Sequence, residues 1–509
     1  QAGLPAAKRI FPGRWAYTLE QIDFARNCQE LIGRGERAVQ EALRCVAALQ
    51  DGDSLLETLE RAHLLSEIQD PSPMVEYSVY RFLIVFLMDM LRPEDEEVLE
   101  ELLDEGQFDW DTIQRYVRQC EQEGVSFDLF DSERPFLQTR YRADWDRDPK
   151  PVSTLDYSIP NGNNHIHFDH KREKITYTPG KALRMMLAAQ IFCTAGAQGY
   201  PSNMNGAPPW FTLIRGKNLF QTLVFGMIEV DRIDLPLDRP PVLWRNPDEV
   251  VSKQKVARTS WLFGMFFPAR RIHLISDESG EYVENVYFSQ GMNFEVTDSW
   301  TDPHVTYRYN AKGRFNWKPS ADEAIWRNLT DLIDTKGKRA PQIIAQYEKL
   351  DTSDRPMSLV IYGVQTNQAN YMRAQRHDLQ IPKKLLGNEN ALRFITEFVA
   401  QAERLGRALY KALTLEEIPE ESRVQARQRY YAVCEQILWS QFDALAQPGF
   451  DYAANLTAAI SWQCRTAAEC VDWTLEQLTL CGRAMLQVMD YQQKVLGKEI
   501  AAIKKGMKI

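Results

Sequence analysis

The amino-acid sequence predicts an α+β protein, in which a large mixed α/β domain is followed by a C-terminal four-helix bundle. At 509 residues the chain is too long for a single hydrophobic core. Strand-like and helix-like apolar patterns alternate before residue 388, whereas only helical periodicity follows it. We therefore expect a helical N-terminal segment of unassigned role (1–50), the α/β domain (51–387) and the bundle (388–509).

The first part of the predicted α/β domain is mainly helical. Segment 71–91 is hydrophobic nearly all round, so it predicts a helix buried at the centre of a large domain. The acidic stretch 94–111 is typical of a solvated helix face. The aromatic segment 127–138 predicts a loop that docks onto the core.

A helix predicted at 178–194 leads into a loop rich in glycine and asparagine. Thr178 and Pro179 supply an N-cap and a first-turn proline. Glycines in the following stretch, 195–206, let the backbone approach a ligand closely, although a plain helix-to-strand connection is the alternative. No Gly-Lys-Ser/Thr sequence follows, so the loop is not a phosphate-binding loop.

Several short segments further along alternate like β-strands. A tight turn at 277–280 predicts a hairpin between two of them. A helix is expected at 219–230. The expected strands are 210–216, 261–267, 271–275, 282–288 and 305–309.

The stretch 358–378 combines a buried strand with a run of amides. Its apolar, β-branched part, 359–364, predicts the strand. The basic residues Arg373, Arg376 and His377 come after the amides. Amides donate and accept hydrogen bonds, so these side chains can read base edges. The alternative interpretation of the amide run is a turn that caps a helix. The four amides within six residues are Gln365, Asn367, Gln368 and Asn370.

Charge and cysteine usage narrow the classes of function. The net charge is −10, so any binding of nucleic acid must rely on local basic patches. The eight cysteines form no Cys-x-x-Cys pair, which favours core thiols in a reducing cytoplasm. No apolar run reaches membrane-spanning length and no signal peptide is visible at the start. We expect a cytoplasmic protein with no cofactor and no membrane partner.

One loop carries a metal-binding pattern. In metallo-β-lactamase-like hydrolases this pattern follows an apolar strand, whereas here it follows Pro-Asn-Gly-Asn-Asn, which is turn chemistry. A metal-dependent hydrolase is therefore the alternative function. The His-x-His-x-Asp-His residues that could hold zinc are His165, His167, Asp169 and His170.

Four landmarks, in their order along the chain, resemble the CasA family, the large subunit of the type I-E CRISPR Cascade complex. Segment 300–304 and the C-terminal bundle also match, so the resemblance covers about residues 51–509. The landmarks are the docking loop 134–138, the loop from Asn163 and Asn164 to Phe168, Asp169 and His170, the glycine-rich loop after the helix at 181–194, and Asn367-Gln368-Ala369 followed by Arg376-His377-Asp378.

The resemblance implies a subunit without enzymatic activity that binds the protospacer-adjacent motif of foreign double-stranded DNA from the minor groove. It would help to open the duplex for the guide RNA and recruit a helicase-nuclease, beside the other Cascade subunits. Gln368 would be the wedge that splits the first base pair, and Asn367 a neighbouring contact. The loop 163–170 would anchor the subunit at the 5′ end of the guide RNA. The glycine loop that presses its backbone on the groove would be Gly196, Ala197, Gln198 and Gly199.

The sequence departs from this family at two places. Some members carry a four-cysteine zinc knuckle, which would fall near 271–288, where this chain has no cysteine. We therefore expect no zinc. The family usually starts with a strand that contains a Trp-Ile-Pro-like sequence, whereas residues 1–50 predict two helices.

A stripe of basic residues lies along the predicted bundle of this otherwise acidic protein. We expect it to line a groove for displaced or duplex DNA. A solvated helix face is the alternative, and a helical scaffold protein without DNA contact is the remaining class. The stripe consists of Arg404, Arg407, Lys411, Arg423 and Arg427.

Overall fold

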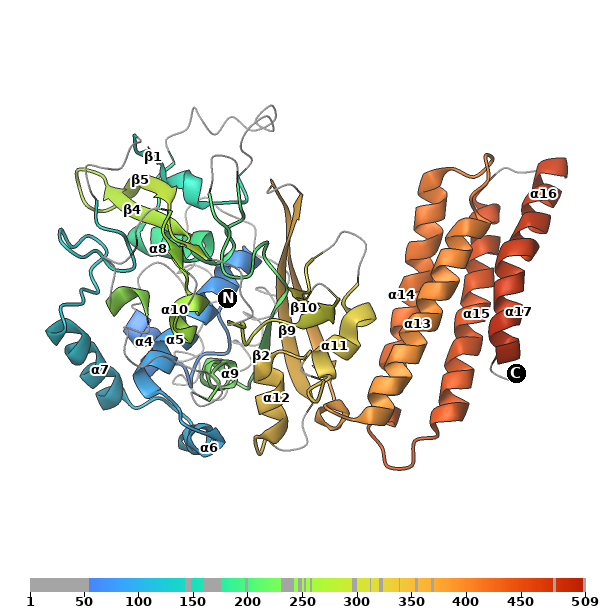
Figure 1. Cartoon of the computed structure of the whole chain (residues 1–509), viewed down its shortest axis with the longest axis horizontal. Helices are drawn as coiled ribbons and strands as arrows, with labels where there is room; N and C mark the ends of the chain where they lie inside the picture. The colour runs from blue at the N-terminus through green and yellow to red at the C-terminus, as the bar shows by residue number, and fades with distance from the viewer. Residues whose placement is uncertain are drawn as a thin grey trace, which may run out of the picture.

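The structure, a computed structural model, has a mixed α/β body beside a bundle of long helices (Figure 1). This arrangement confirms the predicted fold class. The N-terminal residues 1–50 lie outside the described part of the chain. The structure describes residues 55–141, 148–159, 175–196, 200–229, 242–245, 250, 253–256, 259–294, 300–311, 313–319, 324–337, 339–352, 356–367, 370–478 and 482–506.

Helix α5 (Pro73–Leu91) forms the centre of the body, as predicted for a segment that is apolar nearly all round. Fifteen of its nineteen residues are buried, so no face of it is left to solvent. It packs against the helices α8 (Pro179–Ile191), α9 (Leu219–Gly226) and α10 (Trp261–Met265) and against the strand β9 (Met357–Asn367). The other body helices are α4 (Leu55–Glu60), α6 (Glu96–Glu105), α7 (Trp110–Gln122), α8 (Pro179–Ile191), α9 (Leu219–Gly226), α10 (Trp261–Met265), α11 (Leu329–Ile333) and α12 (Gln342–Lys349).

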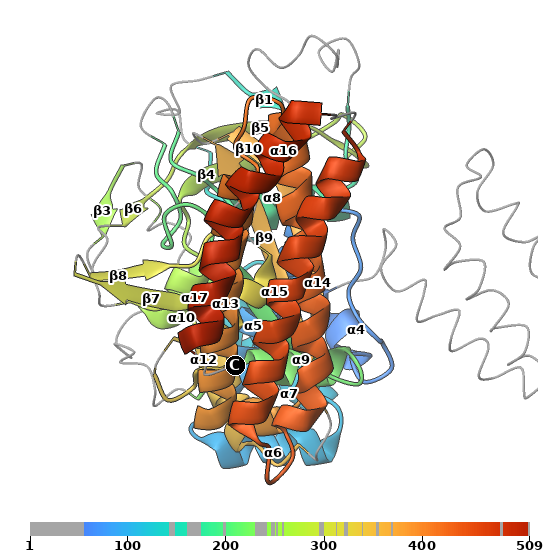
Figure 2. The same cartoon turned by 90° about the vertical axis from the view of Figure 1, so that its right-hand side faces the viewer.

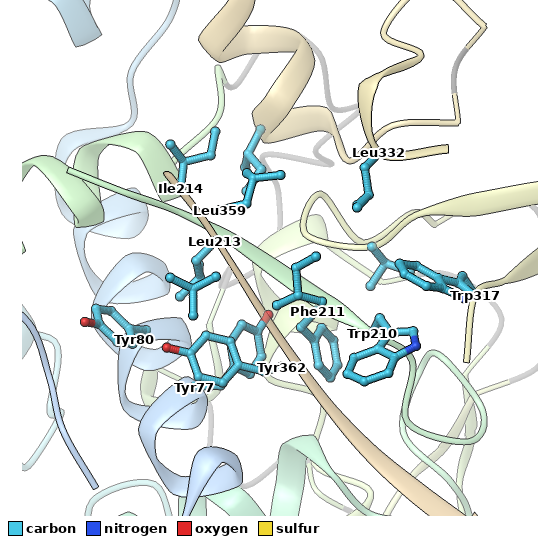
Figure 3. Packing of buried hydrophobic residues seen from close by; sticks show 14 of the residues in the cluster. Tyr77, Tyr80, Trp210, Phe211, Leu213, Ile214, Trp317, Leu332, Leu359 and Tyr362 are labelled. Atoms are coloured by element: carbon cyan, nitrogen blue, oxygen red, sulfur yellow. The ribbon is translucent and has the colours of Figure 1, made fainter. Parts of the chain in front are cut away.

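The sheet that faces α5 is antiparallel, with the strand order β10–β9–β2. Its strands are β2 (Phe211–Arg215), β9 (Met357–Asn367) and β10 (Asn370–Ile381). Figure 3 shows aromatic side chains filling the space between the helix and the sheet. Tyr77 of α5 stacks on Phe211 with ring centroids 4.5 Å apart, and it lies 5.4 Å from the Tyr362 ring. These aromatic contacts fix the sheet on the central helix.

Smaller sheets complete the body. The hairpin turn predicted at 277–280 is confirmed between β4 and β5. The strand predicted at 261–267 is wrong, because Ser260 caps the short helix α10 there. The small sheets contain β1 (Lys150–Pro151), β4 (Arg270–Ser276) and β5 (Val283–Gln290), then β3 (Lys255–Val256) with β6 (Asn293–Phe294), and β7 (Tyr307–Asn310) with β8 (Gly313–Asn316).

The C-terminal helices stand side by side in the bundle (Figure 2). Helices α13, α14 and α15 pack against one another, and the last helical stretch packs across α13. That stretch joins α16 to α17 through a π-helical segment, Gln493–Gly497. The bundle helices are α13 (Glu389–Ala412), α14 (Glu420–Leu445), α15 (Tyr452–Glu476), α16 (Gly482–Gln492) and α17 (Lys498–Gly506).

An aromatic joint attaches the bundle to the body. The buried Trp326, which precedes α11, lies 6.3 Å from the Phe398 ring of α13. Its neighbour Arg327 forms an ion pair with Glu403 and sits over the Tyr431 ring, 4.7 Å from the centroid. The joint therefore holds the first two bundle helices against the body. In the described part of the chain, no helix is long and apolar enough to cross a membrane.

Candidate nucleic-acid interface

The amide run lies at the end of a β-hairpin formed by β9 and β10. Strand β9 is buried over most of its length and ends at the exposed Asn367, which pairs with Asn370. The tip residues Gln368 and Ala369 lie outside the described part of the chain. The alternative of a turn that caps a helix is wrong, because a strand follows the amides. A rigid hairpin therefore carries the predicted wedge.

Charged residues hold the base of this hairpin, which is the half from the Arg376–Tyr362 pair to the open end. Arg376 of β10 donates to the Glu76 carboxylate of α5 at 2.7 Å and to Glu67 at 3.1 Å. The Tyr362 hydroxyl donates to Glu76 at 2.6 Å. Burial raises the pKa of Glu76, although Tyr362 and Arg376 act in the opposite direction. Arg376, one of the basic residues that follow the amides, therefore has a structural role, because its side-chain hydrogen bonds all go to carboxylates of the protein itself.

Near its tip, the hairpin is tied to the start of the glycine-rich loop. The Tyr371 hydroxyl donates to the Phe192 carbonyl at the end of α8, at 2.5 Å. The Tyr371 ring stacks on Tyr157 with centroids 4.5 Å apart. The Tyr157 hydroxyl in turn donates to the Ala189 carbonyl at 2.9 Å. The structure therefore brings the hairpin end and the loop after α8 together, although they are far apart in the sequence.

A buried arginine spans the two ends of the glycine-rich loop. Arg270 of β4 donates to the Thr194 carbonyl at 2.8 Å and to the Pro201 carbonyl at 2.5 Å. The exposed Gly196 donates its amide to the Tyr200 carbonyl at 3.1 Å. The two ends of the loop are therefore held together, by Arg270 and by the bond between Gly196 and Tyr200. Ala197, Gln198 and Gly199 lie outside the described residues.

Beneath the loop lies a fully buried ion pair. Arg81 of α5 donates to both carboxylate oxygens of Asp302, at 2.9 and 2.7 Å, and to the Tyr77 hydroxyl. Asn205 of the glycine-rich loop donates to Asp302 at 2.9 Å. Against the effect of burial, Arg81 holds the pKa of Asp302 below its usual value. The central helix, the loop and segment 300–304 are thus joined through one carboxylate.

Tyr157, Arg270 and Tyr371 are not predictable from local sequence, because their contacts span large sequence separations. A signal did exist for the ion pair. Arg81 interrupts an otherwise apolar helix, and a buried guanidinium requires an acidic partner. Segment 300–304 contains that partner, Asp302.

The residues of the basic stripe on the bundle differ in their contacts within the protein. Arg404 forms an ion pair with Glu499 of α17. Arg423 donates to the carbonyls of Leu415 and Ile418, so it holds the turn between α13 and α14. The other stripe residues are Arg407, which is 71% exposed and 3.8 Å from Glu403, Lys411, which is exposed, and Arg427, which lies 4.9 Å from the Tyr410 ring.

The loop with the metal-binding pattern lies outside the described residues, as do all its predicted site residues. Among the residues that the structure does describe, no group of three or more His, Cys, Asp or Glu side chains is placed to hold a metal ion. The loop residues concerned are Asn163, Asn164, His165, His167, Phe168, Asp169 and His170.

The chain is similar in sequence to known CRISPR-associated proteins. The chain matches the family model of CRISPR-associated protein Cse1 over residues 48–472. CRISPR-associated protein CasA/Cse1 of Thermus thermophilus is 28% identical over 377 residues, which cover 69% of this chain and 72% of the relative. The family matched is not that of metallo-β-lactamase-like hydrolases, so that alternative gains no support.

Solved structures share the fold. Cse1 of Thermobifida fusca superposes with a TM-score of 0.70 at 20% identity, over 89% of this chain and 94% of that one. A chain from a structure described as a CRISPR RNA-guided surveillance complex gives a TM-score of 0.64 at 20% identity, over 84% of this chain and 95% of that one. Both matches extend over the body and the bundle.

Proposed function

This chain belongs to the CRISPR-associated protein Cse1 family, and on that premise we propose that it is the large subunit of an RNA-guided surveillance complex that recognises and opens double-stranded DNA. The family agrees with the CasA resemblance of the sequence. The likeness to a chain of a surveillance complex supports membership in such an assembly. The other subunits and the guide RNA would be its partners.

One observation carries the DNA-opening part of the proposal, namely the attachment of the hairpin end to the glycine-rich loop. The hydrogen bond from Tyr371 to Phe192 and the Tyr157 stack support a single site for both predicted DNA-contacting segments. A backbone segment can follow the minor groove, whose hydrogen-bonding pattern is degenerate. An inserted side chain can then replace lost base stacking. In this scheme the loop 196–199 reads the motif, and Gln368 with Asn367 separates the strands.

Base pairing with the guide RNA, and not this subunit, would supply most of the sequence specificity. We assign the loop 163–170 to anchoring at the 5′ end of the guide RNA. Recruitment of the helicase-nuclease completes the proposed role, and the chain itself would catalyse no reaction. The protein would act in the cytoplasm, where the complex meets foreign DNA.

The bundle would add phosphate contacts. Arg404 and Arg423 already have partners within the chain, so they contribute less to an external groove. The better placed cations for displaced or duplex DNA are Lys411, Arg427 and the 71% exposed Arg407, whose ion pair with Glu403 is long at 3.8 Å. They lie near the turn between α13 and α14, at the same end of the molecule as the tip of the β9–β10 hairpin (Figure 1). One DNA molecule can reach both regions from that end.

The test uses the complex reconstituted with guide RNA and compares Gln368→Ala with wild type. On a fully paired target, we expect the variant to open the duplex about 10- to 100-fold more slowly, because unstacking one step costs a few kcal/mol. A target mismatched beside the motif should bind both proteins almost equally well. Gln114→Ala, an exposed amide change on α7 on the opposite side of the body, is the control.

Equal impairment on paired and mismatched targets would make Gln368 a binding contact and not a wedge. Failure of the wild-type complex to bind any double-stranded target would refute the proposed function itself. Stopped-flow fluorescence of a base analogue beside the motif measures the opening rate, and filter binding measures the affinity.

A further inference from the structure

A β-bulge lies three residues from the tip of the β9–β10 hairpin. Tyr371 pairs with Thr366, but the next pair along the strands is Arg373 with Gln365. Met372 is therefore the extra residue, with no partner in the ladder. A bulge of this kind redirects the side chains on either side of it.

The bulge turns neighbouring side chains to opposite faces of the hairpin. Tyr371 faces α8, because its hydroxyl reaches the Phe192 carbonyl. Arg373 faces away, on the side of His377, whose ring lies 5.4 Å from Trp210. Consistent with this placement, burial and then the charge of Arg373 lower the pKa of His377. Without the extra residue, Tyr371 and Arg373 would share one face.

Met372 and Arg373 are exposed, unlike the residues on either side of them. The Met372 side chain is 60% exposed, which makes it one of the most exposed large apolar residues in the described part of the chain. Arg373 is exposed and forms no ion pair with another described residue. Arg270 and Arg376 near the same hairpin are instead fully used by the protein's own carbonyls and carboxylates. An apolar side chain beside an unpaired cation is therefore presented to the outside.

We propose that Met372 and Arg373 form a second contact for one strand of the opened DNA, with Met372 against a base or sugar and Arg373 on a phosphate. This proposal rests on the proposed function and names a site beyond the wedge. Methionine is among the apolar side chains that proteins insert against unstacked bases, and arginine neutralises phosphates. The contact would keep the separated strand from pairing again.

The position of the bulge limits which nucleotides can be reached. Strand residues advance about 3.3 Å each, so Met372 lies about 10 Å back from the tip. Stacked nucleotides of one strand advance about 3.4 Å each. The contact therefore falls within about three nucleotides of the first opened pair. Tyr371 and the base of the hairpin hold the contact in place.

The test measures opening of a paired target by the reconstituted complex, with a fluorescent base analogue at each of the first three positions beside the motif. Met372→Ala should slow opening about fivefold to tenfold, and Met372→Leu should restore most of the rate. Arg373→Gln should reduce the slope of log affinity against log salt by about 0.7 to 0.9, the value of one phosphate contact. Arg115→Gln, an exposed arginine of α7, is the matched control.

The possible outcomes separate this inference from the proposed function. If wild type opens the target while Met372→Ala and Arg373→Gln behave like Arg115→Gln, the second contact is refuted and the proposed function stands. If wild type binds no double-stranded target, the proposed function fails first. If the two variants no longer assemble with the RNA and the other subunits, the bulge is a subunit interface, and the inference is wrong. Unchanged thermal unfolding of each variant confirms that the fold is intact.

Discussion

The two ends of the β9–β10 hairpin are built in different ways. At the base, Arg376, Glu76 and Tyr362 form a largely buried network, and the remaining hydrogen bonds of Arg376 go to Glu67 and Asp378. Near the tip, Met372 and Arg373 are exposed, and Arg373 has no ionic partner among the described residues. The same pair of strands is thus rigid scaffold at one end and accessible surface at the other.

This difference indicates which substitutions affect stability and which affect function. A side chain that must enter a base stack needs a support that does not move when it meets the DNA. The buried network and the packing of Tyr77 of α5 on Phe211 of the sheet provide that support (Figure 3). Changes at the base should therefore lower the free energy of unfolding, whereas changes at the tip should alter the opening and binding of DNA.

The largest expected effect comes from removing the arginine at the base. Arg376→Ala leaves the Glu76 carboxyl buried without its cation, so we expect the free energy of unfolding to fall by about 3 kcal/mol. Arg373→Ala, three residues nearer the tip, should change it by no more than about 0.5 kcal/mol. Urea denaturation of both variants measures the contrast. Equal losses of stability would show that the two ends do not differ in this way.

A second prediction uses pH to probe the buried layer under the hairpin. His304 is fully buried, with Nδ1 3.0 Å from the Tyr77 hydroxyl and Nε2 2.9 Å from the Gly226 carbonyl. Burial lowers the pKa of His304 from 6.5 to about 4. The charge of Arg81 also lowers it, by more than the charge of Asp302 raises it. The unfolded chain therefore binds a proton below pH 6.5, while the folded protein binds one only near pH 4.

The stability from His304 is present above pH 6.5 and is lost as the pH falls towards 4. We expect the free energy of unfolding to decrease by about 2 kcal/mol between about pH 7 and pH 5 through this group. The raised pKa of Glu76 acts in the opposite direction, so the comparison is made with His304→Gln, which keeps Glu76. A shallower pH dependence in His304→Gln supports the prediction. Parallel curves for the two proteins would contradict it.

The elements that the sequence predicted well depend on local signals. Helix α5 was expected because a helix that is apolar nearly all round must be surrounded by apolar groups, here the core of the body. The N-cap at Thr178 is confirmed, since its side chain accepts from the Lys181 amide. The strand expected at 261–267 failed because every residue of α10 is buried, and a fully apolar run has no period that separates helix from strand.

The candidate site was only partly predictable, because its assembly depends on contacts between distant segments. The amide run marked the end of a buried strand, but nothing local indicated that Tyr371 would reach Phe192, 179 residues away. The bulge at Met372 was also hidden, since it interrupts the alternation that identifies a strand. The buried pair of Arg81 and Asp302 could have been inferred, because an arginine within a central helix must be neutralised.

A smaller change in stability than those at Arg376 and His304 is expected at Tyr371, which lies between the base and the tip. Tyr371→Phe keeps the stack on Tyr157 but removes the hydrogen bond to the Phe192 carbonyl, so we expect a loss of about 1 kcal/mol. Because this bond ties the hairpin end to the glycine-rich loop, the variant should open a paired target more slowly, and it should bind a pre-opened target normally.

Tyr371→Leu removes the stack as well and should impair opening further. Tyr157→Phe keeps the stack but loses the hydroxyl that bonds the Ala189 carbonyl and interacts with Arg270, so it should have a weaker effect on the tip. The decisive measurement is the ratio of opening rates on paired and pre-opened targets, since a simple loss of stability leaves that ratio unchanged. If Tyr371→Phe lowers stability without altering the ratio, the tyrosine belongs to the scaffold, and the boundary between the two ends of the hairpin lies closer to the tip than Tyr371.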